Sequence, residues 1–496
     1  MLKGIPFKLT LTDNRLMIRK TLLLWACLLA ISHSLMAEVK LPEIFQDHMI
    51  LQQGVANFIW GDANPNEKVE VSWAEKSKSV TADSGGKWKV ELAPLQASSV
   101  AGELTIRGEN TIVIKDVLVG EVWLAAGQSN MVSGIKQVPR SQRQVFMDQK
   151  NNQRIRGYIN GKWYLLSEQA LHTSAVGFFF ANKLEKALGV PVAYVVVAAL
   201  GSKIEPFVPP VEAKEFELGE KASGIFSKRI LPLSSYSFKG AIWYQGESNR
   251  GSKNYYQCLQ ALHTGWSRVF DMPKLPFYQV QIAPFNKSLE ATNLISDGVW
   301  KAQYRATSEI EGMEIIPLHD TGISVKHIHP RSKQPVGERL AAMALKYQYG
   351  KNVITAGPKV MKAKRRGEAV VVSFDNIDQG LTTSDGQAPS FFELSKDGKV
   401  FMKAYAQIID NEVEVSSPDL TQPNYVRMGW HDVALPNLKD KNGWPAFSFP
   451  PLSWSSSFKI SSRQTSSSKL FGCCGPRSPM CGGQALHGRC NPMTEC

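Results

Sequence analysis

One serine in this chain follows an apolar run at a position from which it could act as a nucleophile. The run Val122–Ala126 leads directly into Gly127-Gln128-Ser129-Asn130-Met131. A serine hydroxyl that emerges from a strand end after a glycine can attack a carbonyl carbon, and its own amide can point at the oxyanion that develops. The segment is not the Gly-x-Ser-x-Gly nucleophile elbow, because Met131 stands at the last position. Taken by itself, Gly-Gln-Ser is more typical of an ordinary turn.

Two further polar segments follow apolar runs and offer hydrogen-bond donors for a ligand. Gly201 comes shortly after the run 195–199, and a glycine lets a backbone N–H approach a ligand closely. Asn249 closes the segment 245–249, and its side-chain amide is a suitable donor. A plain turn glycine and a polar loop are the alternative interpretations. Further candidate site residues are Gln128, which precedes Ser129, and Gln245 and Glu247, which lie in the segment of Asn249.

A fourth segment contains two histidines, His327 and His329, followed by Pro330. Imidazole exchanges a proton near neutral pH, so either ring is suited to act as a general base. Two histidines at this spacing are also compatible with a metal site. Because no other Cys, His or Asp of metal-ligand spacing lies nearby, we favour the general base and expect no metal and no organic cofactor.

The elements that must position these residues alternate between strands and helices. Buried strands are expected at 117–126, 192–199, 240–244 and 277–282, and helices at 176–188 and 336–347. Such alternation predicts a mainly parallel sheet with helices on both faces. Because ligands bind beyond the carboxyl ends of strands in open α/β sheets, we expect the four polar segments to meet at one sheet edge.

Short strands flank this central region on both sides. Expected strands lie at 57–60, 69–73 and 87–92 before it, and at 369–374, 391–394 and 413–416 after it. The predicted fold class is therefore α/β, with a mainly parallel three-layer domain between N- and C-terminal β-sandwich-like regions. The predicted boundaries are 1–37 for a signal peptide, 38–115 for the N-terminal β domain, 116–350 for the α/β domain, 351–454 for the C-terminal β region and 455–496 for a Ser- and Cys-rich tail.

The composition excludes several classes of protein. With 496 residues, 43% hydrophobic and 20% charged, the chain is globular and long enough for two or three domains. The net charge of +13 is concentrated at the ends, since 1–37 and 455–496 each hold five Lys or Arg against one acidic residue. Without a basic cluster in the body, we expect no nucleic-acid partner. No apolar run approaches the roughly 20 residues of a transmembrane segment.

Both ends of the chain differ from its body. Arg19 and Lys20 precede the apolar run 22–31, and small residues lead to Ala37, the order of a secretory signal peptide. We therefore expect a secreted or periplasmic protein, lysosomal or extracellular if eukaryotic. Five cysteines crowd into 473–496, whereas Cys258 stands alone in the body, which we expect to fold without disulfides. The tail is expected to be disordered, with a small disulfide knot as the alternative.

Taken together, the motifs resemble those of the sialate O-acetylesterase family of the SGNH hydrolase superfamily. The central blocks that carry the resemblance are Val122–Met131 (VWLAAGQSNM), Ser174–Pro191 (SAVGFFFANKLEKALGVP), Lys239–Asn249 (KGAIWYQGESN) and Ile328–Leu340 (IHPRSKQPVGERL). Two outer segments agree as well: Leu41–Gln52 with Trp60-Gly61, and Tyr425–Asn442. The similarity extends from about residue 40 to about residue 450 and leaves out the tail.

The resemblance implies a role for each of four residues. Ser129 matches the nucleophile, Gly201 and Asn249 match the oxyanion donors that act with the Ser129 amide, and His329 matches the base. Two positions depart from the pattern. Related proteins commonly have Trp-Gly-Gly-Thr where this chain has 199–202 (ALGS), and many SGNH enzymes have an aspartate where Lys326 stands.

Because Lys326 cannot accept the imidazole N–H, the group that orients His329 must differ from the usual one. Asp320, after the strand-like run 314–319, is our preferred third catalytic residue, and Glu247 is its rival. A dyad without any carboxylate is the remaining possibility, since serine, base and oxyanion hole would still act.

The resemblance implies a carbohydrate O-acetylesterase that releases acetate through a serine acyl-enzyme. Its substrate would be O-acetylated sialic acid or an acetylated polysaccharide such as xylan. The alternative is a secreted carbohydrate-binding protein on the same fold that no longer turns over. The intact set of Ser129, Asn249 and His329 favours the enzyme.

Overall fold

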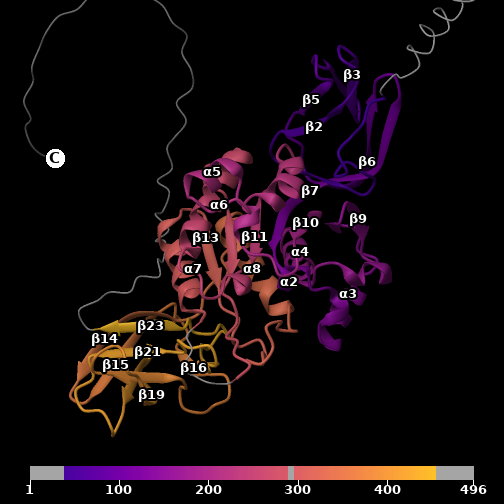
Figure 1. The fold of residues 1–496 in the computed structure, drawn as a ribbon. Coiled ribbons are helices and arrows are strands. Elements are labelled where there is room, and N and C mark those ends of the chain that lie inside the picture. Colours follow the sequence, from indigo (N-terminus) through magenta and orange to yellow (C-terminus); the bar gives the residue numbers. More distant parts are fainter. Residues whose placement is uncertain (1–37, 289–294, 454–496) are drawn as a thin grey trace, which may run out of the picture. The chain divides into compact units, whose positions relative to one another are not determined.

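The computed structural model describes residues 38–288 and 295–453. Its central part is a large, mostly parallel sheet with helices, and antiparallel sheets precede and follow it in the chain (Figure 1). The predicted α/β fold class is thereby confirmed. The predicted signal peptide and the tail 455–496 lie outside the described residues. Within the described residues, no helix has the length and apolar character needed to cross a membrane.

The central sheet has the order β13-β12-β11-β7-β10-β8-β9. All neighbours are parallel except β9, which runs antiparallel to β8. The strand in the middle, β7, is flanked directly by β10 and β11, so their carboxyl ends meet at one place. The strands are β7 Thr111–Gly127, β8 Ile155–Ile159, β9 Lys162–Leu165, β10 Val192–Ala198, β11 Gly240–Tyr244, β12 Phe277–Val280 and β13 Met313–Ile316, which confirms the four predicted strands.

Helices cover both faces of this sheet. Successive side chains of β7 point alternately to the two faces and pack against the helices there. Trp123 and Ala125 pack in one apolar cluster with α4 and α8, whereas Val122 and Leu124 pack in another with α6 and α7. The helices are α2 Ser129–Val132, α3 Arg140–Asp148, α4 Ala175–Leu188, α5 Pro210–Glu215, α6 Tyr255–Val269, α7 Asp297–Glu309 and α8 Gln334–Tyr347. The predicted helices at 176–188 and 336–347 are confirmed by α4 and α8.

Local sequence sets the ends of α4. The Ser174 hydroxyl accepts a hydrogen bond from the Gly177 N–H at 3.0 Å, which satisfies one of the free donors of the first turn. At the other end Gly189 has a φ of +70°, the left-handed conformation in which helices commonly stop at glycine.

The N-terminal β region shares its last strand with the central sheet. Within it β2 pairs with β5, β3 pairs with β4 and β6, and both β1 and β6 pair with β7. β7 therefore continues without a break through residue 115, where we placed a domain boundary, and the boundaries themselves stay predictions. The strands of this region are β1 Ile50–Gln52, β2 Asn57–Asp62, β3 Lys68–Trp73, β4 Lys76–Thr81, β5 Lys87–Leu92 and β6 Ser98–Arg107.

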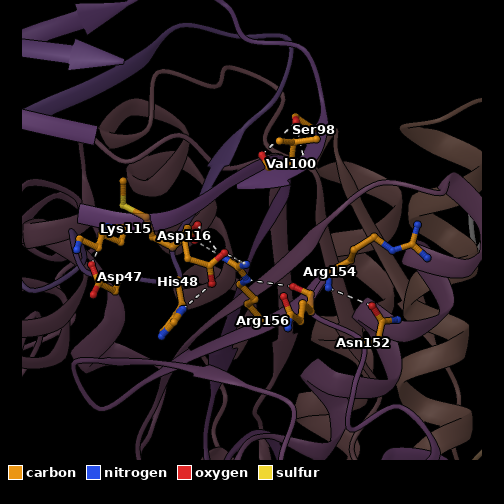
Figure 2. Close-up of polar contacts among 11 residues, drawn as sticks. Asp47, His48, Ser98, Val100, Lys115, Asp116, Asn152, Arg154 and Arg156 are labelled. Carbon is orange, nitrogen blue, oxygen red and sulfur yellow. Dashed lines mark hydrogen bonds and ion pairs between the residues drawn. The ribbon is translucent and has the colours of Figure 1, made fainter. Parts of the chain in front are cut away.

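Three polar residues, His48, Asp116 and Arg156, tie this region to the central sheet (Figure 2). We call them the junction cluster. Arg156 is fully buried, and its guanidinium donates to the Asp116 carboxylate at 2.9 Å and to the Asp116 backbone oxygen at 2.5 Å. His48 Nδ1 lies 2.6 Å from the other carboxylate oxygen. Burial alone would raise the pKa of Asp116, but the bond to His48 and the charge of Arg156 outweigh it and lower that pKa.

The C-terminal region consists of antiparallel sheets around one apolar cluster. Two four-stranded sheets, β14-β15-β20-β19 and β18-β17-β21-β23, contribute to that cluster, and β16 pairs with β22. The strands are β14 Lys359–Arg366, β15 Ala369–Asp375, β16 Leu381–Thr383, β17 Phe392–Ser395, β18 Met402–Lys403, β19 Tyr405–Ile409, β20 Glu412–Ser416, β21 Tyr425–Met428, β22 Leu438–Asp440 and β23 Phe449–Ser453. The expected strands at 369–374, 391–394 and 413–416 are confirmed.

Candidate active site

The sheet brings three of the four polar segments to one edge. In the registers of the central strands, Gly127 at the end of β7 pairs with Ala198 of β10 on one side and with Tyr244 of β11 on the other. Ser129, Gly201 and Asn249 follow these three strand ends within a few residues. The order of the strands, which the sequence alone does not reveal, is therefore what brings them together.

Gly127 makes the turn before the nucleophile candidate possible. Its φ is +139°, and a Cβ built on it would lie 2.2 Å from the Tyr244 backbone oxygen, so no side chain fits there. The next residue, Gln128, donates its backbone N–H to the same oxygen at 3.0 Å. Ser129 then begins α2 and is half-buried.

Ser129 and His329 form a hydrogen-bonded pair. Their Oγ and Nε2 atoms are 2.8 Å apart, although the residues are 200 positions apart in the sequence. His329 lies in the segment between β13 and α8. Partial burial and then the positive charge of Lys333 lower the pKa of His329, so the imidazole is largely neutral at neutral pH and can accept the serine proton.

A cavity of about 620 Å³ opens at this pair. Ser129 and His329 line it, together with the exposed side chain of Leu200, which precedes Gly201. Lys136 and Arg331 also line it and bring two positive charges to its wall. The cavity has the volume of a small-molecule site and is open at the reacting pair.

The two oxyanion candidates differ in how firmly they are held. Asn249 is buried, and its Oδ1 accepts from the Ile204 N–H at 3.0 Å and from Gln245 Nε2 at 2.8 Å. These bonds fix the direction of Nδ2, which donates to both carboxylate oxygens of Glu205 at 3.2 Å. Gly201 is exposed with a φ of +64°, and no acceptor for its N–H is found among residues 38–288 and 295–453.

The other candidates, Gln128 and Gln245, connect the loops of the site. Gln245 is fully buried, and its Nε2 lies 3.1 Å from Gln128 Oε1 and 3.1 Å from the Ser202 backbone oxygen. Gln128 Oε1 also accepts from the Ser248 N–H at 3.2 Å. The two amides therefore hold the loops after β7, β10 and β11 to one another.

The structure does not bring Asp320 to His329. Both carboxylate oxygens of Asp320 accept from the guanidinium of Arg339, at 2.7 and 2.5 Å. Glu247, the rival candidate, instead accepts from Asn130 Nδ2 at 2.5 Å. In the part of the chain that the structure describes, no carboxylate forms a hydrogen bond with the His329 ring.

Two residues at the site that carried no predicted role are Asn130 and Lys333. Lys333 is buried, with 1% of its surface exposed, and its Nζ donates to Asn130 Oδ1 at 2.6 Å. Burial lowers the pKa of Lys333 to about 7, against the opposing charge of Glu247. No sequence signal marks this lysine, because a lysine in a polar segment before a helix is normally solvated.

Comparisons with known proteins agree with this geometry. Residues 119–346 match the family described as carbohydrate esterase, sialic acid-specific acetylesterase. The chain is 28% identical to a carbohydrate acetylesterase from Xanthomonas citri, whose crystal structure superposes with a TM-score of 0.77 over 83% of this chain and 99% of that one. It is 26% identical to the sialate O-acetylesterases of Homo sapiens and of Pongo abelii, each over 62% of this chain and 71% of that protein.

These matches confirm the predicted resemblance to the sialate O-acetylesterase family. They also confirm that the chain is an ester hydrolase. The matched segment 119–346 contains Ser129, Gly201, Asn249 and His329 and therefore spans the site described above.

Proposed function

We propose that this protein is a secreted carbohydrate O-acetylesterase that releases acetate from O-acetylated sugars through a serine acyl-enzyme. The observation that carries the proposal is the 2.8 Å contact between Ser129 Oγ and His329 Nε2 on the wall of a 620 Å³ cavity. A nucleophile in direct contact with a neutral base is the arrangement that acyl transfer needs. The carbohydrate acetylesterase and sialate O-acetylesterase names of the similar proteins support the substrate class.

In the first half of the reaction, His329 Nε2 takes the proton of Ser129 as Oγ attacks the acetyl carbonyl carbon. The tetrahedral intermediate collapses when the bond to the sugar oxygen breaks, and the imidazolium gives that proton to the departing hydroxyl. In the second half, His329 activates a water that attacks the acetyl-serine. Acetate leaves, and the serine recovers its proton.

The negative charge of the intermediate needs donors beside Ser129. Its own amide, the Gly201 amide and the side-chain amide of Asn249 are the groups that we assign to this oxyanion hole. The contacts of Asn249 Oδ1 with Ile204 and Gln245 support the assignment, because they hold Nδ2 in one orientation before substrate binds. Loss of one such donor typically lowers kcat about 10²- to 10³-fold.

The charges of the cavity favour an acidic sugar over a neutral polysaccharide. Lys136 and Arg331 line the cavity beside Ser129 and can attract the carboxylate of an O-acetylated sialic acid. Replacing both by glutamine should raise KM for O-acetylated sialic acid by about fivefold and leave KM for acetylated xylan unchanged. An equal change for both substrates would contradict this preference.

The decisive test of the proposed function is acetate release by Ser129→Ala. Wild type should release acetate from an O-acetylated sugar, and Ser129→Ala should not, while Ser98→Ala, which removes a hydroxyl in the N-terminal β region, should match wild type. Binding of acetylated sugar without turnover by wild type would support the binding-protein alternative. Secretion rests on the sequence of residues 1–37, and N-terminal sequencing of the mature protein tests it.

A further inference from the structure

A buried side-chain amide lies next to Ser129 in the chain. Asn130, the residue after Ser129, has no exposed surface and forms three contacts through its side chain. Its Oδ1 accepts from Lys333 Nζ at 2.6 Å, and its Nδ2 donates to Glu247 Oε1 at 2.5 Å and to the Ile328 backbone oxygen at 3.1 Å. We call Asn130, Glu247 and Lys333 the site cluster.

These contacts leave only one orientation for the Asn130 amide. An ammonium group can only donate, and a carboxylate or a backbone carbonyl can only accept. If the amide were flipped, its NH₂ would face the ammonium of Lys333, and its oxygen would face Glu247 and the Ile328 carbonyl. The hydrogen bonds to Glu247 and Ile328 would then be lost whether the Lys333 amine is charged or neutral, so the network itself fixes the side chain.

Each contact of Asn130 reaches a different segment of the site. Glu247 lies in the loop after β11, two residues before Asn249, and Ile328 is the neighbour of His329. Lys333 lies immediately before α8, and its ammonium is also 5.0 Å from the centre of the Tyr244 ring at the end of β11. The nucleophile, the base and the oxyanion asparagine are thus all within two residues of this one network.

We propose that Asn130 and Lys333 are positioning residues that hold Ser129 and His329 at reacting distance. This inference rests on the proposed function and assigns to the network the task for which an orienting carboxylate is normally used. Here the base is held through its backbone neighbour Ile328 rather than through a hydrogen bond to the ring. The Lys333 contact keeps the amide turned so that Nδ2 reaches that carbonyl.

The composition of the cluster fits such a role better than a role in stability alone. A buried lysine and a buried carboxylate are costly to remove from water, and well-packed apolar side chains of similar size are often as stable. The Asn130 amide contacts both Lys333 and Glu247, and these two side chains form no direct ion pair with each other among the described residues. Rigid support around a site is known to matter, because a displacement of about 1 Å can lower a rate about 100-fold.

The test compares Lys333→Met and Asn130→Leu with the control Lys326→Met, an exposed lysine of the same segment. With p-nitrophenyl acetate as substrate, the first two variants should lose about 10- to 100-fold in kcat with KM changed less than about threefold. Lys326→Met should match wild type. Thermal unfolding followed by circular dichroism reports whether each variant is folded.

Lys333→Met removes the positive charge near the buried Glu247 carboxylate, and the variant could fail to fold for that reason. A second variant covers this case. The double variant Lys333→Met, Glu247→Gln removes both charges but keeps an oxygen that can accept from Asn130 Nδ2. It should fold and still show the kcat defect. Wild-type kcat in a folded Lys333→Met or in the double variant would overturn the positioning role.

The failures of the two proposals are distinguishable. A wild-type protein without esterase activity would contradict the proposed function itself. Suppose that the wild type is active and depends on Ser129, and that Lys333→Met and Asn130→Leu keep wild-type kcat. This result would contradict only the positioning role.

Discussion

The junction cluster and the site cluster both involve buried charges next to β7, but they are built differently. In the junction cluster the guanidinium of Arg156 meets the Asp116 carboxylate directly, and His48 contacts the remaining oxygen. In the site cluster an amide separates the ammonium of Lys333 from the Glu247 carboxylate. The contacts with His48 and Arg156 outweigh burial and lower the pKa of Asp116, whereas burial outweighs the favourable contacts of Glu247 and raises its pKa.

This difference fits a cluster that supports the fold and a cluster that, in our proposal, supports chemistry. Both carboxylate oxygens of Asp116 have partners, whereas Glu247 Oε2 has none among the described residues. A buried polar atom without a partner costs stability, which is tolerable where the same group positions reacting atoms. We therefore expect changes at the junction to lower stability and changes at the site to lower kcat.

The largest expected effect on rate comes from the base. His329→Ala should lower kcat about 10⁴- to 10⁶-fold, because Ser129 would lose the imidazole that accepts its proton at 2.8 Å. Its thermal unfolding should stay close to that of wild type. His327→Ala, an exposed histidine two residues away, is the matched control and should keep wild-type kcat. Equal loss in both variants would show that the segment, and not the imidazole, matters.

The junction should show the opposite pattern. Asp116→Asn should lower the free energy of unfolding by about 3 kcal/mol, because the Arg156 charge stays buried without its counter-charge, and kcat of the folded protein should be unchanged. Asn tolerates the φ of +53° at this position, so the backbone need not move. Denaturant titration measures the loss. Asp47→Asn, at an exposed carboxylate that accepts the Lys115 backbone N–H, should cost less than about 0.5 kcal/mol.

The contribution of Asp116 to stability should depend on pH. The pKa of Asp116 is lower in the folded than in the unfolded chain, so its contribution is complete above the unfolded pKa and is lost as pH falls through the folded pKa. The stability difference between wild type and Asp116→Asn should therefore shrink at acid pH. A difference that stays constant into that range would contradict the assigned ion pair.

The smallest effect expected is a shift in the pH dependence of activity. Activity requires neutral His329, whose pKa is lowered by burial and by the charge of Lys333, so the wild type should stay active below the ordinary titration range of histidine. Lys333 has a pKa of about 7 and is charged over that range. Lys333→Met should move the acidic limb of kcat/KM to higher pH, and an unmoved limb would contradict this electrostatic contact.

Much of the fold could be predicted because its elements depend on local patterns. The apolar run before Gly127 indicated the buried part of β7, and Ser174 and Gly189 lie at the ends of a predicted helix. What the pattern did not show is that β7 begins at Thr111 and belongs to two regions at once. That continuity depends on pairing with β1 and β6, which are distant contacts that leave no periodic signal in β7 itself.

The site was predictable where a motif names a reacting group and not where a residue only supports one. Ser129 and His329 stood in motifs with a chemical meaning, and the structure places them in contact. Asp320 was preferred on its position after a strand, but Arg339, 19 residues later on α8, holds both its oxygens. Asn130 and Lys333 gave no signal, because the roles that we propose for them come from burial and from contacts across about 200 residues of chain.

The most direct test of the central claim, that Ser129 activated by His329 is the nucleophile, is labelling with a fluorophosphonate followed by peptide mass spectrometry. The account predicts that folded wild type carries the label on the Ser129 peptide, that labelling is much slower in His329→Ala, and that it disappears in Ser129→Ala. Label on another residue, or no label on folded wild type, would contradict the account.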